Sequence, residues 1–337
     1  MPVPNTVPVE ALVERWLRSP LRRHFVVHEM IEGTRARSRP LPQWLDPRLR
    51  QALAARGVER LYSHQARAVD LVWRPPPEPG TAEPRGGARD AVVATPTASG
   101  KTLCYNLPVF QTLLADPRAR AIYLFPTKAL ARDQVEEARA LAAGLDPPIG
   151  VAVYDGDTPP DQRRAARRNA RILATNPEML HTGILPHHPA WSELLAGLRF
   201  VVIDELHVYR GVFGSHVAHL MRRLIRLARF HGADPVFICS SATIANPAEL
   251  ARRLIGRPVE LIDQSGAPSG PRHFMIYNPP LVDEALGIRQ SYLKASCTLA
   301  RQLVDAAINT LVFCRTRQAV EVLLRYLRDT VDAGRSA

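Results

Sequence analysis

The chain has 337 residues, of which 46% are apolar and 23% are charged, and these values predict a soluble globular protein of more than one domain. They exclude collagen-like, disulfide-scaffold and wholly disordered proteins, and no apolar run reaches the roughly 18 residues of a membrane span. The net charge of +12 indicates a polyanionic partner such as nucleic acid. A bias towards arginine is the alternative, because only three of the 44 basic residues are lysine.

The cysteines indicate a reducing compartment. All four are far apart and none forms a C-x-x-C pair, so neither a zinc ribbon nor a disulfide framework is predicted: Cys104, Cys239, Cys297, Cys314. The N-terminus has no charged segment followed by an apolar one, so no secretory signal is predicted. We therefore expect a cytoplasmic protein with no membrane partner.

Residues 1–58 are rich in proline and arginine and are predicted to form an N-terminal extension, with a helix at Val9–Leu17. An amphipathic segment follows from Arg60 to about Trp73. The stretch Arg74–Asp90 is rich in proline and glycine and is predicted to be a surface loop.

Within residues 59–265, short β-branched runs alternate with longer helical patterns. Each run is apolar on both faces, which is typical of a strand covered by helices on each side. Strands spaced by helices imply right-handed crossovers and a parallel sheet, so the predicted fold class is α/β. The six predicted strands are Ala91–Thr95, Ala121–Pro126, Ile149–Tyr154, Arg171–Asn176, Phe200–Glu205 and Pro235–Ser240.

Residues 266–337 are predicted to hold a linker, within Gln264–Gly270, and a second, shorter series of elements. This series comprises two strands and two helices: strand Phe274–Tyr277, a helix from about Arg289 to Ile308, strand Thr310–Cys314 and helix Gln318–Thr330.

The segment Thr95–Thr102 lies between a predicted strand and a predicted helix, which is the context of a phosphate-binding loop. Backbone N–H groups of such a loop surround phosphates, Lys101 can reach the β- and γ-phosphates, and the Thr102 hydroxyl can bind Mg²⁺. Thr95 stands where the strict pattern has glycine, so the match is imperfect. A chance Gly-Lys-Thr turn is the alternative.

The run Phe200–His207 is a buried strand that ends in two acids. Acids at the carboxyl end of a parallel strand lie on the ligand-binding edge of the sheet. Asp204 could hold Mg²⁺ and Glu205 could take a proton from an attacking water. The alternative is an acidic helix N-terminus.

A basic run carries two open interpretations. It could contact phosphates along DNA, or it could be a solvated helix face balanced by Asp155, Asp157 and Asp161. Its members are Arg163, Arg164, Arg167, Arg168 and Arg171.

Together these motifs resemble superfamily 2 helicases, the DEAD/DEAH-box relatives. The matching segments are Tyr62–Gln65 (a Q-type motif), Thr95–Thr102, Phe125–Leu130 (motif Ia), Thr175–Leu180 (motif Ib), Asp204–His207, Ser241–Thr243 and Val312–Arg317 (motif IV). Within the superfamily the chain is similar to the N-terminal part of the bacterial MrfA/YprA type of DNA repair helicase. The resemblance implies a RecA-like P-loop NTPase domain, over residues 59–265, and the start of a second one.

The resemblance also implies a role for each matching residue. ATP and Mg²⁺ are the implied cofactors. The implied ATP-binding residues are Tyr62, Gln65 (on the adenine edge), Thr97, Ala98, Ser99, Gly100, Lys101 and Thr102, with Thr102 and Asp204 on Mg²⁺. Catalysis is implied for Lys101, Asp204, Glu205 and His207, coupling to nucleic acid for Ser241 and Thr243, and backbone contacts to nucleic acid for Thr127, Lys128, Thr175, Asn176 and Arg315.

The sequence departs from the family pattern in three places. Ala98 replaces a glycine, and neither the Q-x-x-G-R-x-x-R segment with its arginine fingers nor a four-cysteine zinc domain follows motif IV. An arginine finger contributes about 10³–10⁵ in rate. We therefore expect an incomplete motor that binds ATP but turns it over slowly alone.

The predicted function is ATP-dependent DNA unwinding or translocation in repair, 3′ to 5′, on single-stranded or partly duplex DNA at the nucleoid. An RNA-directed DEAD-box ATPase is one alternative. A non-catalytic module that binds ATP and single strands, or that pairs with a separate chain supplying the rest of the second domain, is the other.

Overall fold

The computed structural model describes residues 8–73 and 88–335. The chain divides into two compact units, Thr34–Ser269, here called the sheet unit, and Met1–Gly33 with Gly270–Ala337, here called the ribbon unit. The predicted loop Arg74–Asp90 lies outside the described residues, apart from its last three positions. No helix in the described ranges is long and apolar enough to cross a membrane.

The sheet unit contains one parallel sheet of seven strands in the order β10-β4-β9-β8-β5-β7-β6. All six strands predicted within residues 59–265 are present, which confirms the α/β fold class. The seventh, β10, was not predicted because three residues are too few to show a period. The bounds are β4 Ala91–Ala94, β5 Arg120–Leu124, β6 Val151–Tyr154, β7 Ile172–Thr175, β8 Leu198–Ile203, β9 Val236–Ser241 and β10 Glu260–Ile262.

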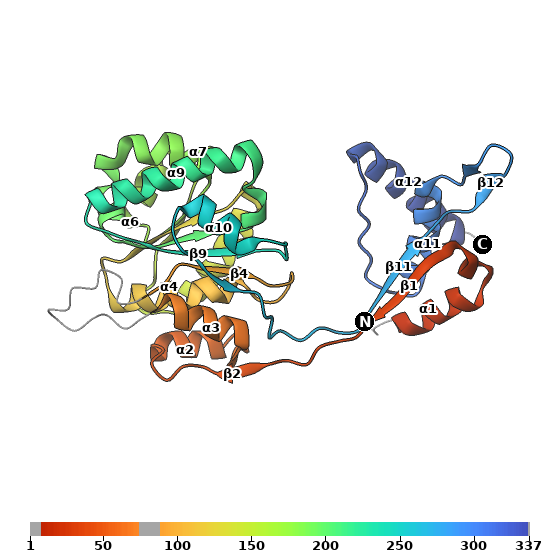
Figure 1. Cartoon of the computed structure of the whole chain (residues 1–337), viewed down its shortest axis with the longest axis horizontal. Helices are drawn as coiled ribbons and strands as arrows, with labels where there is room; N and C mark the ends of the chain where they lie inside the picture. Colours follow the sequence, from red (N-terminus) through yellow and green to blue (C-terminus); the bar gives the residue numbers. More distant parts are fainter. Residues whose placement is uncertain (1–7, 74–87, 336–337) are drawn as a thin grey trace. The chain divides into compact units, whose positions relative to one another are not determined.

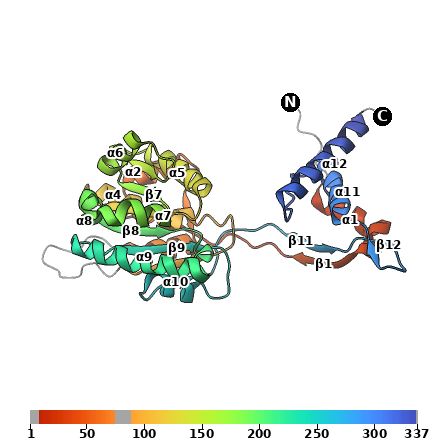
Figure 2. The same cartoon turned by 90° about the horizontal axis from the view of Figure 1, so that it is seen from above.

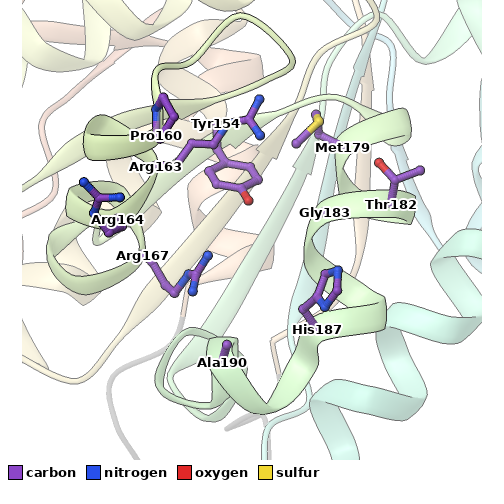
Figure 3. A pocket seen from close by; sticks show the side chains of 10 residues that line it. All are labelled: Tyr154, Pro160, Arg163, Arg164, Arg167, Met179, Thr182, Gly183, His187 and Ala190. Carbon is purple, nitrogen blue, oxygen red and sulfur yellow. The ribbon is translucent and has the colours of Figure 1, made fainter.

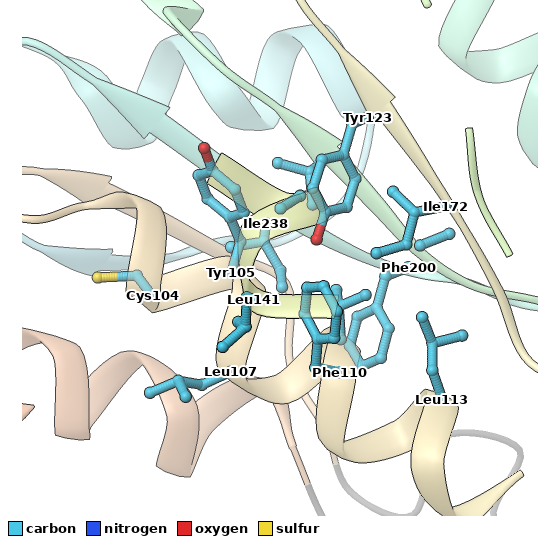
Figure 4. Close-up of a cluster of buried hydrophobic side chains, with 14 of the residues drawn as sticks. Cys104, Tyr105, Leu107, Phe110, Leu113, Tyr123, Leu141, Ile172, Phe200 and Ile238 are labelled. Atoms are coloured by element: carbon cyan, nitrogen blue, oxygen red, sulfur yellow. The ribbon is translucent and has the colours of Figure 1, made fainter. Parts of the chain in front are cut away.

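Helices cover both faces of this sheet, and successive strand residues alternate between two cores (Figures 1 and 2). In β5, Tyr123 packs into the first core and Ile122 into the second. Figure 4 shows side chains of α4 meeting the sheet in the first core. The first core also contains α2 Pro47–Ala54, α3 Ser63–Val72, α4 Thr102–Ala115 and α5 Lys128–Ala142; the second contains α6 Pro160–Asn169, α8 Ser192–Ala196, α9 Gly211–Phe230 and α10 Pro247–Ile255.

The segment before the sheet divides differently from the expected extension 1–58. Residues from Thr34 onwards belong to the sheet unit, because Leu49 and Leu53 of α2 are buried in its first core. Strand β2 (Ser38–Pro40) also pairs antiparallel with β3 (Arg60–Tyr62).

The ribbon unit joins the two ends of the chain. Strand β1 (Phe25–Ile31) pairs antiparallel with β11 (Arg272–Tyr277), and Leu12 and Trp16 of α1 pack in a small core with Ala306. The remaining elements are α1 Val9–Arg18, hairpin β12 Leu281–Asp283 and β13 Ile288–Arg289, α11 Tyr292–Asp305 and α12 Arg317–Arg335. The predicted helices and the strand at Phe274–Tyr277 are therefore present.

The predicted strand Thr310–Cys314 is wrong. The segment is irregular, and Leu311 and Phe313 are 78% and 87% exposed. A strand is held by hydrogen bonds to a neighbour, and none of the strands in the described ranges pairs with this segment. The apolar pattern of this segment is consequently not sufficient to make it a strand.

Candidate functional site

The predicted phosphate-binding loop connects β4 to α4 by a backbone with two left-handed residues. Ala98 has φ +60° and Gly100 has φ +77°. Across the loop the buried hydroxyls of Thr95 and Ser99 lie 2.7 Å apart. A loop of this kind presents a concave run of backbone groups next to a helix N-terminus, which suits an anion.

Lys101 and Thr102 follow directly. The Lys101 ammonium donates hydrogen bonds to the carbonyls of Thr95 (2.9 Å) and Pro96 (3.0 Å), so it spans the loop. Burial lowers the pKa of Lys101, and the negative charges of Glu205 and Asp204 oppose this shift. The Thr102 hydroxyl donates to Gln134 Oε1 at 3.1 Å; no sequence signal had singled out Gln134 on α5.

Asp204 and Glu205 come at the carboxyl end of β8. Asp204 is 8% exposed, and its Oδ1 accepts hydrogen bonds from the Ser240 hydroxyl and from the Glu205 N–H (3.0 Å). Burial raises the pKa of Asp204, while these two hydrogen bonds and the charge of Lys101 oppose the rise. Ser240 was missed from sequence, because only the three residues after it match a motif.

His207 connects the acidic motif to the Ser241–Thr243 segment. Its Nδ1 lies 3.2 Å from Glu205 Oε2 and 3.4 Å from the N–H of Ala242. The link thus runs through the backbone of Ala242, rather than through the predicted side chains. Ser241 is buried, and its hydroxyl meets no partner among the described residues, whereas Thr243 is exposed.

Gln65 is directed at the phosphate-binding loop. Its side-chain amide accepts from the Tyr62 N–H (2.8 Å) and donates to the Gly100 carbonyl (2.9 Å), and the residue is 2% exposed. Tyr62 is partly buried beside it. In this arrangement Gln65 supports the loop, and its contact with the adenine edge stays a prediction.

The residues predicted to touch nucleic acid have different surroundings. Thr127 and Asn176 cap α5 and the short helix α7 (Pro177–Met179), and Lys128 Nζ lies 2.7 Å from Asp157 Oδ1. Thr175 is buried, and its hydroxyl donates to the Tyr154 carbonyl at 2.6 Å. This places Thr175 inside the sheet. The fifth candidate is exposed and belongs to the ribbon unit: Arg315.

The basic run divides between two places. Arg171 donates to the carbonyls of Leu113 and Asp116, both at 2.6 Å, at the amino end of β7. By contrast, three of the four arginines of α6 line an open pocket of about 590 Å³ next to the carboxyl ends of β6 and β7 (Figure 3). It is lined by Tyr154, Pro160, Arg163, Arg164, Arg167, Met179, Thr182, Gly183, His187 and Ala190.

Two of the arginines in this pocket interact with backbone carbonyls or an aromatic ring. Arg163 donates to the carbonyls of Thr158 (2.8 Å) and Asp155 (3.0 Å), and the Arg167 guanidinium lies 5.4 Å from the centre of the Trp191 ring. Of the three acids expected to balance the run, Asp157 pairs with Lys128, and Asp155 Oδ1 accepts a hydrogen bond from the Thr158 hydroxyl. Both interpretations of the run stay open.

The DEAD/DEAH box helicase family model matches residues 80–250, about half of the chain. The chain belongs to this family. The ATP-dependent helicase YprA of Bacillus subtilis is 48% identical over 304 residues, which are 90% of this chain and 39% of YprA. The ATP-dependent helicase HRQ1 of Saccharomyces cerevisiae is 37% identical, over 82% of this chain and 25% of HRQ1.

Solved structures of helicases are also similar to this chain. A crystal structure of the helicase MrfA bound to DNA superposes with a TM-score of 0.88 at 45% identity, over 96% of this chain and 41% of MrfA. The complex of MrfA with DNA and AMPPNP also gives a TM-score of 0.88. This DEAD/DEAH box chain therefore spans about two fifths of the length of YprA and MrfA.

Proposed function

We propose that the chain is the ATP-binding part of a DNA helicase or translocase of superfamily 2. One observation carries the proposal: the phosphate-binding loop, the Asp204–Glu205 pair and the Ala242–His207 link come together at the carboxyl edge of one parallel sheet. Ligands of open α/β sheets bind at this edge.

ATP and Mg²⁺ fit the residues present. The left-handed positions Ala98 and Gly100 shape the loop for phosphates, and Lys101 is poised to exchange its two carbonyl partners for phosphate oxygens. Thr102 and Asp204 offer the oxygen ligands that Mg²⁺ prefers. The metal would supply charge neutralisation of the phosphates.

The other proposed roles are those of individual side chains of this chain. Glu205 would accept the proton of the attacking water, and His207 lies beside it, with Nδ1 3.2 Å from Glu205 Oε2. His207 would link the acidic motif to the backbone of Ala242, because its Nδ1 accepts a hydrogen bond from the Ala242 N–H at 3.4 Å. Thr127, Lys128, Asn176 and Arg315 would contact the backbone of nucleic acid. Ser241 and Thr243 would couple the nucleotide site to nucleic acid.

DNA is the proposed polymer, because MrfA was crystallised with DNA and is 45% identical over almost all of this chain. The DEAD-box helicase Mss116, solved with bound ssRNA, is 17% identical to this chain, so its similarity shows the fold alone. The proposal has further parts. The helicase would move 3′ to 5′ and act in repair at the nucleoid in the cytoplasm. Residues 266–337 would belong to a second RecA-like domain, which a partner chain would complete.

The test is binding of a fluorescent ATP analogue and of single-stranded DNA or RNA to the chain, beside Lys101→Ala. We expect Mg²⁺-dependent nucleotide binding that falls at least about tenfold in the variant, and tighter binding of DNA than of RNA. Equal nucleotide binding by both proteins would contradict the nucleotide site, and a clear RNA preference would replace DNA as the polymer. DNA-stimulated ATP hydrolysis that disappears in the variant would further support a motor.

A further inference from the structure

Two neighbouring side chains in the first turn of α3 hold different parts of the sheet unit. Gln65 donates to the Gly100 carbonyl of the phosphate-binding loop at 2.9 Å. His64 Nδ1 accepts a hydrogen bond from the Gly266 N–H at 3.1 Å. Gly266 belongs to the segment that continues into the ribbon unit, and His64 is 1% exposed. One helical turn therefore contacts both the loop and that segment.

Gly266 is fixed tightly at this point. Its carbonyl accepts from the Arg37 N–H at 2.9 Å, and the Arg37 guanidinium donates to the Ser265 carbonyl at 2.7 Å. A Cβ atom built on Gly266 would lie 2.3 Å from Ser63 Oγ and 2.6 Å from the Arg37 carbonyl oxygen. A residue with a Cβ would therefore fit only if this backbone shifted, and such a shift would disturb the hydrogen bond from the Gly266 N–H to His64.

The ring of His64 is also affected by the phosphate-binding loop. A backbone N–H can only donate, so Nδ1 carries no proton, and a neutral imidazole then carries it on Nε2. Nε2 is buried and meets no partner at hydrogen-bond geometry within the described part of the chain. Burial lowers the pKa of His64, the Ser99 backbone opposes this, and the Lys101 charge lowers it further, so both loop residues act on the ring.

We propose that His64 is a positioning residue that couples the state of the phosphate-binding loop to the Gly266 segment. The inference rests on the proposed nucleotide site. When phosphates displace the Lys101 ammonium from the carbonyls of Thr95 and Pro96, the loop adjusts. Gln65 passes the adjustment to the first turn of α3, and His64 passes it to the Gly266 N–H. If His64 served only to fill space in the core, nucleotide binding would not alter the hydrogen bond of the Gly266 N–H.

Hydrogen exchange of the Gly266 amide tests this, with and without Mg²⁺ and AMPPNP, in the full chain. The variants separate the two ring nitrogens. In His64→Asn the amide oxygen replaces Nδ1 as acceptor, whereas His64→Phe keeps the ring and removes the acceptor. We expect a severalfold nucleotide-dependent change in exchange in the unmodified chain, retained by His64→Asn and abolished in His64→Phe.

Two results would overturn the coupling: no change in Gly266 exchange although AMPPNP binds, or an unchanged response in His64→Phe. Binding is measured separately with the fluorescent analogue, so absence of nucleotide binding would instead overturn the nucleotide site, and the coupling with it. If His64→Phe does not fold, His64→Gln serves, because its longer side chain displaces the acceptor from the Nδ1 position.

Discussion

At the scale of single residues, the phosphate-binding loop contains strain that can be measured. Ala98 is exposed yet has φ +60°, a region that costs a residue with a Cβ roughly 1–2 kcal/mol. Glycine would remove this cost. It would also increase the conformational entropy of the unfolded chain, which lowers the stability of the folded state by roughly 0.4–1 kcal/mol. We expect Ala98→Gly to stabilise the chain by up to about 1.5 kcal/mol, measured by urea unfolding.

Gly100→Ala is the matched change in the opposite direction. Gly100 has φ +77°, and an added Cβ would lie 2.7 Å from Gln65 Nε2, so it would also disturb the hydrogen bond to the Gly100 carbonyl. We expect a loss of roughly 1–2 kcal/mol or more. Equal stability of both variants would show that the loop is not strained at these positions.

His64 also predicts a pH dependence of stability. Its folded pKa is lowered from 6.5, chiefly by burial, so the unfolded chain binds more protons between the folded value and 6.5. The stabilising effect of the neutral imidazole is complete above pH 6.5 and is lost as the pH falls from 6.5 to the folded pKa. Below the folded pKa, protonation of the native His64 also removes the acceptor of the Gly266 N–H.

The free energy of unfolding of the chain and of His64→Asn, which does not titrate, should therefore converge on acidification. Urea titrations at about pH 7.5 and about pH 5, either side of the ordinary histidine pKa, measure the difference. A difference between the two proteins that is independent of pH would contradict the assignment of a neutral His64.

At the scale of elements, α6 presents arginines without an acid partner in the described structure. Reversing two of them, in Arg164→Glu/Arg167→Glu, should weaken DNA binding by about tenfold or more and reduce its salt dependence. Nucleotide affinity should not change, because neither residue contacts the phosphate-binding loop in any hydrogen bond of the described residues. Fluorescence anisotropy over a range of salt concentrations measures both quantities.

A control with the same change of charge lies at the opposite edge of the sheet, where Arg199 pairs with Asp116 at 3.5 Å. Arg118 and Arg199 flank the amino ends of β5 and β8 and line another pocket. Arg118→Glu/Arg199→Glu alters the net charge equally, so an equal loss of DNA binding in both double variants would indicate non-specific attraction rather than a contact at α6.

Elements also show what sequence could predict. Five of the six predicted strands were recognisable because they are largely buried on both faces, and their loops carried the motifs; the sixth, β6, is a partly buried edge strand. The pairing of β1 with β11 was not, since an antiparallel partner more than 200 residues away leaves no local signal. Likewise, Gln134, Ser240 and His64 matter only through neighbours that the fold supplies. The failed strand at Thr310–Cys314 shows the converse, a local pattern without a neighbour.

At the scale of the whole molecule, the two units depend differently on the N-terminus. The described residues before Gly33 supply β1, the partner of every residue of β11, and Trp16, whose indole N–H donates to Gln302 Oε1 at 2.6 Å. The core of the sheet unit, in contrast, draws on residues from Leu45 onwards.

Deleting residues 1–33 should therefore loosen the ribbon unit and leave the sheet unit intact. Limited proteolysis should cut within β11 and α11 at least about tenfold faster, while nucleotide binding stays unchanged. Trp16→Ala in the full chain should give a smaller acceleration, since truncating a buried tryptophan costs roughly 3–5 kcal/mol at most but retains β1. Unaltered cleavage after the deletion would mean that β11 and α11 hold their structure without the N-terminal strand, and that the pairing of the chain ends contributes little to their stability.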